Sequence, residues 1–170
     1  ISTPDHRSMA YPIFSLDGAS IYFIPGPQER AVEIYQMPSA GGPATQITRG
    51  GGFTPLESLD GKWLCYSRYQ THGLWCAPIA GGAERQILNT VLQGSWTIGP
   101  GGIYYFEVSR EPDTPKVVKF YNFETCQSTR IGTVAPTVLR NDSGRTTSVS
   151  HDGRWLLYTD SVNREAVLML

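Results

Sequence analysis

The chain has 170 residues, of which 40% are hydrophobic and 17% charged, and its net charge is -1. This composition is typical of a globular domain and excludes intrinsic disorder. The near-zero charge gives no electrostatic basis for nucleic-acid binding by this segment. Eighteen Gly and twelve Pro favour many turns between short strands over a helical fold. The longest apolar runs are strand-sized, so we expect no membrane insertion.

A tetrapeptide turn marks an internal repeat. Ser-Leu-Asp-Gly stands at 15–18 and returns 43 residues later at 58–61, Ser-His-Asp-Gly follows at 150–153, and a glycine-rich turn at 99–102 occupies the place of a further copy. An Asp-Gly pair favours a tight hairpin, because Gly accepts positive φ and the Asp side chain can cap the turn. Each copy is followed by an aromatic-rich run, at 21–24, 63–66, 103–106 and 155–158.

A second signature follows the same period. Ile-Tyr-Gln-Met-Pro-Ser-Ala-Gly-Gly at 34–42 is matched by Leu-Trp-Cys-Ala-Pro-Ile-Ala-Gly-Gly at 74–82, and short strand-like pieces follow at 45–48 and 85–88. No apolar 3.6-residue period persists long enough for a helix. Four short strands in a unit of roughly 40 residues make one propeller blade. The sequence therefore predicts an all-β fold, a β-propeller of about four blades, each with four antiparallel strands.

The repeat places the blades at about 9–49, 50–89, 92–133 and 146–170 of a single propeller region spanning 1–170. The fourth blade lacks its outermost strand, which residues 1–4 could supply to close a four-bladed ring. Alternatively the chain is an arc of a larger propeller, the option we favour, or two copies complete a larger ring as a homodimer. Both ends look cut from a longer polypeptide, so the sequence does not indicate a periplasmic or cytoplasmic location.

With the repeat laid out, the sequence resembles the TolB-type, WD-repeat-like bacterial β-propellers. The matching features are the Asp-Gly turns before an aromatic strand and the Gly-Gly turns after an Ile-Tyr or Leu-Trp strand. The family pattern is Ser-Pro-Asp-Gly, and Leu16, Leu59 and His151 replace its proline here. The resemblance covers nearly the whole chain. Stretches between Gly101 and Tyr158 are similar to the C-terminal blades of bacterial sensor-type propellers, whose winged-helix or kinase domains are not in this sequence.

Motifs for catalysis and cofactor binding are missing from the sequence. There is no Gly-x-Ser-x-Gly nucleophile elbow, and the glycine runs at 50–52 and 99–102 lack the Lys-Ser/Thr of a phosphate loop. The three histidines, His6, His72 and His151, fall in loops that the repeat places on different faces, so they do not converge on a metal. We therefore predict no enzymatic activity, no cofactor and no metal site.

The three cysteines exclude a full disulfide framework. Cys65 and Cys76 lie on two runs joined by a turn, a placement that is compatible with facing positions across the hairpin. We expect them to pack as small buried hydrophobic side chains in preference to forming a bridge. Cys126 has no apparent partner.

The candidate binding surface is the face whose loops enter the innermost strands. Arginines and acidic residues are mixed there, which favours a solvated rim. The sharper hypothesis is that the arginines bind an acidic peptide, protein or small anion, with aromatic side chains as anchors. The candidate contact residues are Arg7, Arg49, Phe53, Arg68, Tyr69, His72, Trp96, Arg140 and Arg145.

We therefore expect a non-catalytic binding, scaffold or sensory module of a larger bacterial protein, with a protein or peptide partner. The alternative is the substrate-gating propeller of a prolyl-oligopeptidase-type serine peptidase, whose catalytic domain would lie outside this chain. A downstream Gly-x-Ser-x-Gly in the longer gene would favour the peptidase.

Overall fold

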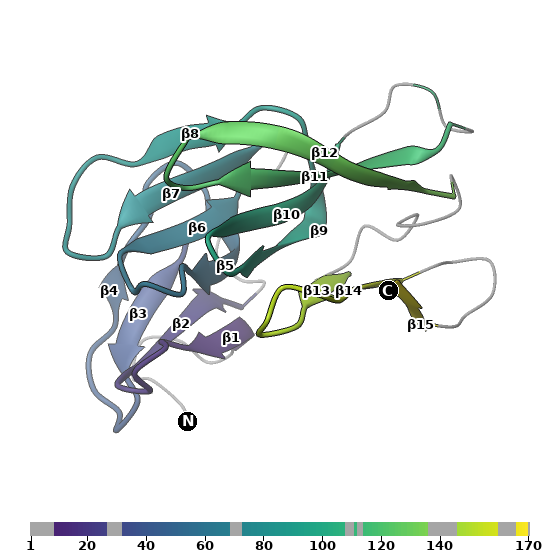
Figure 1. Ribbon diagram of the computed structural model, residues 1–170. Helices are drawn as coiled ribbons and strands as arrows, with labels where there is room; N and C mark the ends of the chain where they lie inside the picture. Colours follow the sequence, from purple (N-terminus) through teal and green to yellow (C-terminus); the bar gives the residue numbers. More distant parts are fainter. Residues whose placement is uncertain are drawn as a thin grey trace. The chain divides into compact units, whose positions relative to one another are not determined.

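The computed structural model describes residues 9–26, 32–68, 73–107, 111, 114–135, 146–159 and 166–169. The regular structure of these residues consists of β-strands in four antiparallel sheets (Figure 1), which confirms the all-β prediction. The described residues include no helix of the length and apolarity needed to cross a membrane. By its contacts the chain divides into two compact units, Ile1–Arg85 and Gln86–Leu170.

The first two sheets are four-stranded meanders in which each strand pairs with the next along the chain. The first contains β1 (Met9–Phe14), β2 (Ser20–Pro25), β3 (Tyr35–Pro38) and β4 (Thr45–Gln46). The second contains β5 (Phe53–Glu57), β6 (Trp63–Ser67), β7 (Leu74–Pro78) and β8 (Arg85–Leu88).

The third sheet repeats this order, and the fourth is one strand shorter. The third contains β9 (Val91–Gly99), β10 (Gly102–Glu107), β11 (Lys116–Asn122) and β12 (Gln127–Val134). The fourth contains β13 (Thr147–Val149), β14 (Leu156–Thr159) and β15 (Ala166–Met169). The described part of the fourth sheet thus has three strands. Residues 1–4, the expected source of its outermost strand, lie outside the described residues.

The Asp-Gly turns are built alike in three of the sheets. In the second sheet, the Ser58 hydroxyl donates to Oδ1 of Asp60 (2.6 Å), which also accepts from the backbone N–H of Lys62 (3.1 Å). Gly61 has a φ of 68°, a conformation that costs glycine little because it has no Cβ. The same contacts recur in the first and fourth sheets at Ser15, Asp17, Ser150 and Asp152. Four residues thus fix each of these β-hairpins locally.

The first strand of each of three sheets carries a further repeated feature, a bulge. The register of β1, β5 and β9 against the following strand shifts, and a residue with positive φ lies at each shift. These residues are Tyr11 (52°), Thr54 (50°) and Gly94 (74°), which are 43 and 40 residues apart. Thr54 is strained there because its branched Cβ crowds the backbone, and its buried hydroxyl has no hydrogen-bond partner in the described part of the chain.

In the first unit, both faces of β2 are buried. Tyr22 and Ile24 point to one face and pack with Leu64 and Tyr66 of the second sheet. Ile21 and Phe23 point to the other face, where they join a separate cluster that includes Met37. A strand buried on both faces is apolar throughout instead of alternating, which explains the continuous apolar runs in the sequence.

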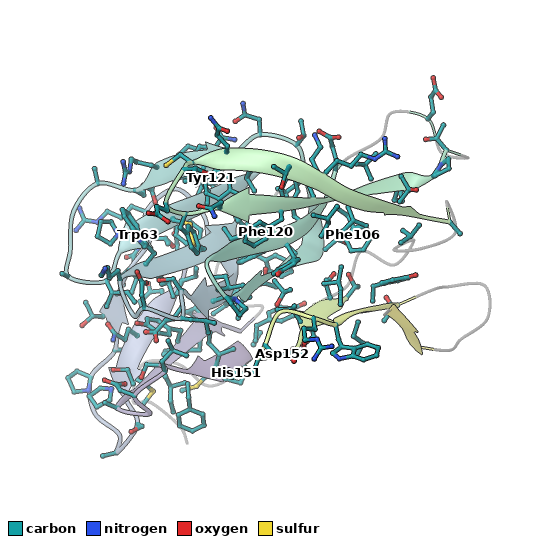
Figure 2. All side chains as sticks on the ribbon, viewed as in Figure 1. Trp63, Phe106, Phe120, Tyr121, His151 and Asp152 are labelled. Atoms are coloured by element: carbon teal, nitrogen blue, oxygen red, sulfur yellow. A yellow bond between two sulfur atoms is a disulfide. The ribbon has the colours of Figure 1, made fainter. Side chains whose placement is uncertain are left out.

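In the second unit, Phe106 lies at the centre of a smaller core (Figure 2). It packs with Val118 and Val134 of its own sheet and with Tyr158 of the fourth sheet, whose ring centroid is 5.8 Å away in an edge-to-face arrangement. Thr146 adds a polar contact between the two sheets, because its backbone N–H donates to the carbonyl oxygen of Gly94 (3.1 Å). The third and fourth sheets therefore pack against each other around a shared hydrophobic core.

Cys65 and Cys76 form a disulfide, which corrects the expectation of two buried thiols. They lie directly opposite each other in the register of β6 and β7, with Cα atoms 4.0 Å apart. Directly opposite positions on neighbouring strands bring the two Cβ atoms close enough for their sulfur atoms to form a disulfide bond. Cys126 is exposed and not disulfide-bonded, in agreement with the sequence expectation.

Candidate binding site between the first two sheets

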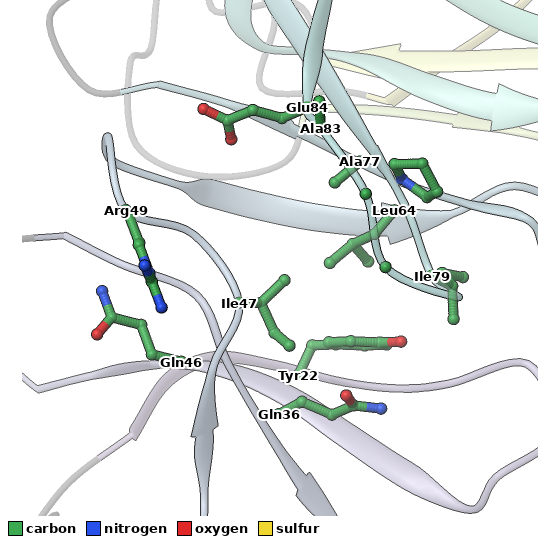
Figure 3. A pocket seen from close by; sticks show the side chains of 13 residues that line it. Tyr22, Gln36, Gln46, Ile47, Arg49, Leu64, Ala77, Ile79, Ala83 and Glu84 are labelled. Carbon is green, nitrogen blue, oxygen red and sulfur yellow. The ribbon is translucent and has the colours of Figure 1, made fainter.

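A pocket of about 480 Å³ opens between the first and second sheets of the first unit (Figure 3). A volume of this size is in the range of small-ligand sites. Figure 3 shows Tyr22, Ile47 and Leu64 meeting at its centre, with Arg49 and Gln46 at one end. The lining residues are Tyr22, Gln36, Gln46, Ile47, Arg49, Leu64, Ala77, Pro78, Ile79, Gly81, Gly82, Ala83 and Glu84.

The floor of the pocket belongs to the core of the first unit. Tyr22 and Leu64 are each 2% exposed and lie in one hydrophobic cluster, against which Ile47 and Ala77 pack. The hydroxyl of Tyr22 donates to Oε1 of Glu57 (2.7 Å). Burial, and then this hydrogen bond to a carboxylate, raise the pKa of Tyr22, so the phenol stays neutral. The floor is therefore buried and uncharged.

Two glutamine side chains, those of Gln36 and Gln46, line the pocket. Nε2 of Gln36 donates to the hydroxyl of Ser20 (3.0 Å), and Nε2 of Gln46 donates to the backbone carbonyl of Thr48 (2.7 Å). These bonds fix the two amide groups. Neither Oε1 has a hydrogen-bond partner among the residues that the structure describes.

The charged lining residues, Arg49 and Glu84, are in different states. Arg49 is exposed and makes no ion pair or hydrogen bond with any described residue. Glu84 accepts hydrogen bonds from the Tyr66 hydroxyl and the Arg68 guanidinium, which also forms an ion pair with it. Arg68 thus compensates the negative charge of Glu84, whereas no described residue forms an ion pair with Arg49.

A buried carboxylate positions the segment that carries Arg49. Glu33, 8% exposed, accepts hydrogen bonds from the hydroxyl of Thr48 and from the backbone N–H of Gly51 (3.1 Å). The same hydroxyl accepts from the backbone N–H of Ile34 (2.9 Å). Contacts on both sides of Arg49 therefore hold its backbone against the first sheet, while its side chain remains in solvent.

Among the sequence-predicted contact residues that the structure describes, Arg49 and Arg68 differ in their surroundings. Arg49 lines the pocket, and Arg68 lies behind it, with its guanidinium carbon 3.6 Å from the ring centroid of Trp75. Nε of Arg68 and Nε1 of Trp75 are buried donors without a partner in the described part of the chain. The other predicted residues Arg7, Tyr69, His72, Arg140 and Arg145 lie outside the described residues.

The two predicted aromatic anchors, Phe53 and Trp96, are buried. Phe53 is 7% exposed and belongs to the core of the first unit, where its ring centroid is 4.9 Å from that of Tyr11. Trp96 is 1% exposed, within the third sheet. Neither ring is presented to solvent, so the structure places both in packing and not at an opening.

Sequence reasoning did not identify Gln36, Gln46 and the apolar floor as parts of a site. A comparison of the repeat copies contains one signal, because Gln36 stands where the second copy has Cys76. Among the described residues, no group of three or more His, Cys, Asp or Glu side chains could hold a metal ion. His151 is exposed in the turn between β13 and β14, next to Asp152 (Figure 2).

Comparison with known protein structures identifies the fold. No protein-family model matches the sequence, and no curated protein matches it. The solved structure of TolB from Acinetobacter baumannii is similar over 93% of this chain and 39% of its own, with a TM-score of 0.68 and 20% identity. A chain of a nidogen/laminin complex is similar over 95% of this chain and 60% of its own, with a TM-score of 0.64 and 14% identity. The fold is that of a TolB-like β-propeller.

Each sheet is accordingly a propeller blade, and the pocket is a cleft between the first two blades. The chain spans about 39–60% of the length of these similar structures. Propellers of enzymes are also similar, such as that of a prolyl endopeptidase, over 96% of this chain and 29% of its own, with a TM-score of 0.57 and 12% identity. At these identities the likeness extends to the fold alone.

Proposed function

We propose that this chain is a non-catalytic propeller module of a larger protein and that it binds a protein or peptide carrying an acidic group. The observation that carries the proposal is that Arg49, at the interblade cleft, has no ion-pair partner among the residues that the structure describes. The other charged lining residue, Glu84, is already bound by Arg68 and Tyr66. A partner carboxylate would supply the missing counter-charge through paired N–H donors of the guanidinium group.

Arg68 is assigned a different role from the one that its sequence position suggested. Its side chain is 15% exposed and is held between Glu84 and Trp75. A partner could bind this guanidinium only by displacing Glu84. We therefore treat Arg68 as a positioning residue that neutralises Glu84 and leaves Arg49 as the contact for an acidic partner.

An array of short random peptides tests this function. The chain should retain peptides enriched in Asp and Glu, and Arg49→Glu should abolish the enrichment. Arg154→Glu is the matched control, because Arg154 is also exposed but lies in the turn after β13. Retention of the same peptides by wild type and Arg49→Glu would contradict the proposal.

The second candidate is the substrate-gating propeller of a serine peptidase. The observation that favours it is the likeness to the prolyl endopeptidase chain, of which this chain covers 29%. Labelling of the longer protein with a fluorophosphonate, which reacts with activated serines, is the test. A labelled serine outside this segment would support the peptidase, and no labelling together with Arg49-dependent peptide binding would support the binding module.

A further inference from the structure

We propose that the cleft between the first two blades holds a short peptide segment in which an apolar side chain is next to a carboxylate. The proposal rests on the acidic-partner function above and adds the neighbouring apolar residue and the backbone contacts. The segment would lie with its apolar side chain on Tyr22 and Leu64 and with its carboxylate at Arg49.

The apolar part follows from the walls of the cleft. Ile47 of the first blade and Ala77 and Ile79 of the second border a hollow whose floor is Tyr22 and Leu64. The only polar atom of these five side chains is the oxygen of the Tyr22 hydroxyl, which already donates its hydrogen bond to Glu57. A side chain entering between them finds no polar partner, so an apolar one of the size of Leu or Phe fits best.

The carboxylate follows from the charges. Among the described residues, Arg49 and Glu84 are the charged ones that line the cleft, and Arg68 compensates Glu84. A cationic ligand would therefore be repelled by Arg49, and Glu84 would offer it little attraction because Arg68 already pairs with that carboxylate. An anionic ligand gains a guanidinium with free donors at the end of the cleft opposite Ile79 (Figure 3).

The peptide backbone follows from the two glutamines. Their Nε2 atoms are fixed to Ser20 and to the Thr48 carbonyl, which leaves each Oε1 as an acceptor at the cleft. Acceptors of this kind are matched by the N–H donors of a peptide. A free aliphatic carboxylate has no such donor and would leave both oxygens to water, so the observations favour a peptide segment.

The experiment uses fluorescently labelled hexapeptides and fluorescence anisotropy with the full chain. One peptide carries Leu-Glu in its centre and an amidated end, a second ends in Leu with a free carboxylate, and a third carries Leu-Gln with an amidated end. Hexanoate serves as a small carboxylate competitor. We expect the neutral Leu-Gln peptide to bind at least about tenfold more weakly than the better of the two acidic peptides. Which of those two binds more tightly identifies the source of the carboxylate as a side chain or a chain end.

Two variants at exposed positions test the two ends of the cleft without altering the core. Arg49→Gln should reduce binding of the acidic peptides about tenfold and leave the Leu-Gln peptide unchanged. Ala83→Phe should fill the cleft and weaken all three peptides, because Ala83 lines it from the exposed turn before β8. Arg154→Gln should change none of them. An N-methyl group on the Leu residue of the peptide should weaken binding, because it removes the N–H that would donate to a glutamine oxygen.

Three results would overturn the inference. These are equal affinity for the acidic and neutral peptides, unchanged binding to Ala83→Phe, and competition by hexanoate as strong as that by an unlabelled peptide. If the peptide array still shows Arg49-dependent enrichment of acidic peptides while Ala83→Phe has no effect, the acidic-partner function stands and the cleft is not its site. Loss of both results would remove the function as well.

Discussion

Glu57 links the first two blades, and its substitution should lower stability through one hydrogen bond in particular. Its Oε1 accepts from the hydroxyl of Tyr22 (2.7 Å) and its Oε2 from the backbone N–H of Leu16 (2.6 Å). Tyr22 is 2% exposed, so Glu57→Ala leaves a buried hydroxyl without its acceptor, at a cost of about 1–3 kcal/mol. The N–H of Leu16 is exposed and can donate to water instead, so the loss of its hydrogen bond to Glu57 adds little to the destabilisation.

A double-mutant cycle separates this bond from the other effects of the substitutions. Tyr22→Phe removes the donor and leaves the carboxylate of Glu57, which is only partly buried and can be hydrated, so it should cost about 1 kcal/mol. The double variant should be more stable than the sum of the two losses predicts, by about 1–2 kcal/mol. Urea unfolding, monitored by tryptophan fluorescence, measures the free energy of unfolding of the wild type, the two single variants and the double variant.

The matched control pairs Glu57→Ala with Tyr105→Phe. The hydroxyl of Tyr105 donates to the hydroxyl of Ser128 (2.9 Å) and shares no partner with Glu57. These two losses should add to within about 0.5 kcal/mol. Additivity of the Glu57 and Tyr22 losses as well would refute the reasoning, because it would mean that the bond between the blades contributes nothing measurable.

Three further predictions concern the blades themselves. Reduction of the bond between Cys65 and Cys76, which closes a loop with a separation of 11 residues, should lower the free energy of unfolding by roughly 2–3 kcal/mol, and titration of three free thiols before reduction would contradict it. Gly102→Ala should lower the Tm sharply because its Cβ would lie 2.0 Å from a backbone carbonyl oxygen of β11, whereas Gly132→Ala, with no atom within 4 Å, should shift it little. The hydrogen bond from Ser58 holds the pKa of Asp60 below 3.8. The stabilisation that the ionised Asp60 carboxylate gives the folded state is therefore complete above pH 3.8 and is lost as the pH falls through the lower folded pKa. Wild type should accordingly lose stability more steeply than Asp60→Asn as the pH falls below 3.8, and parallel curves would contradict this.

The hairpin turns were predictable because their determinants lie within four residues. The Ser-x-Asp-Gly sequence contains both the glycine that accepts positive φ and the carboxylate that receives the hydroxyl and N–H donors. The same period then indicated the strands and the blades. No distant contact is needed for any of these steps, and the repeated copies confirm one another.

The burial of Phe53 could not be predicted in the same way, because it depends on the bulge beside it. Side chains on a strand alternate between faces, and a bulge changes which face each later residue occupies. The bulge here is at Thr54, a residue type that gives no sign of positive φ in a sequence. The pairing of Cys65 with Cys76 likewise depends on strand register, which the hairpin loop sets and the sequence pattern left open.

The cleft was hidden from sequence reasoning for a further reason, which also bears on its specificity. Positions at which the first two copies agree, such as Ile47 and Ile87, build the blades. Two polar residues of the cleft stand at positions where the copies differ, Gln36 against Cys76 and Arg49 against Asn89, whereas Gln46 is matched by Gln86. Cys76 is committed to the disulfide, and asparagine has no charge, so the second copy cannot reproduce the acceptor of Gln36 or the cation of Arg49. Binding of an acidic peptide should therefore be a property of the cleft between the first two blades and not a general consequence of the repeat.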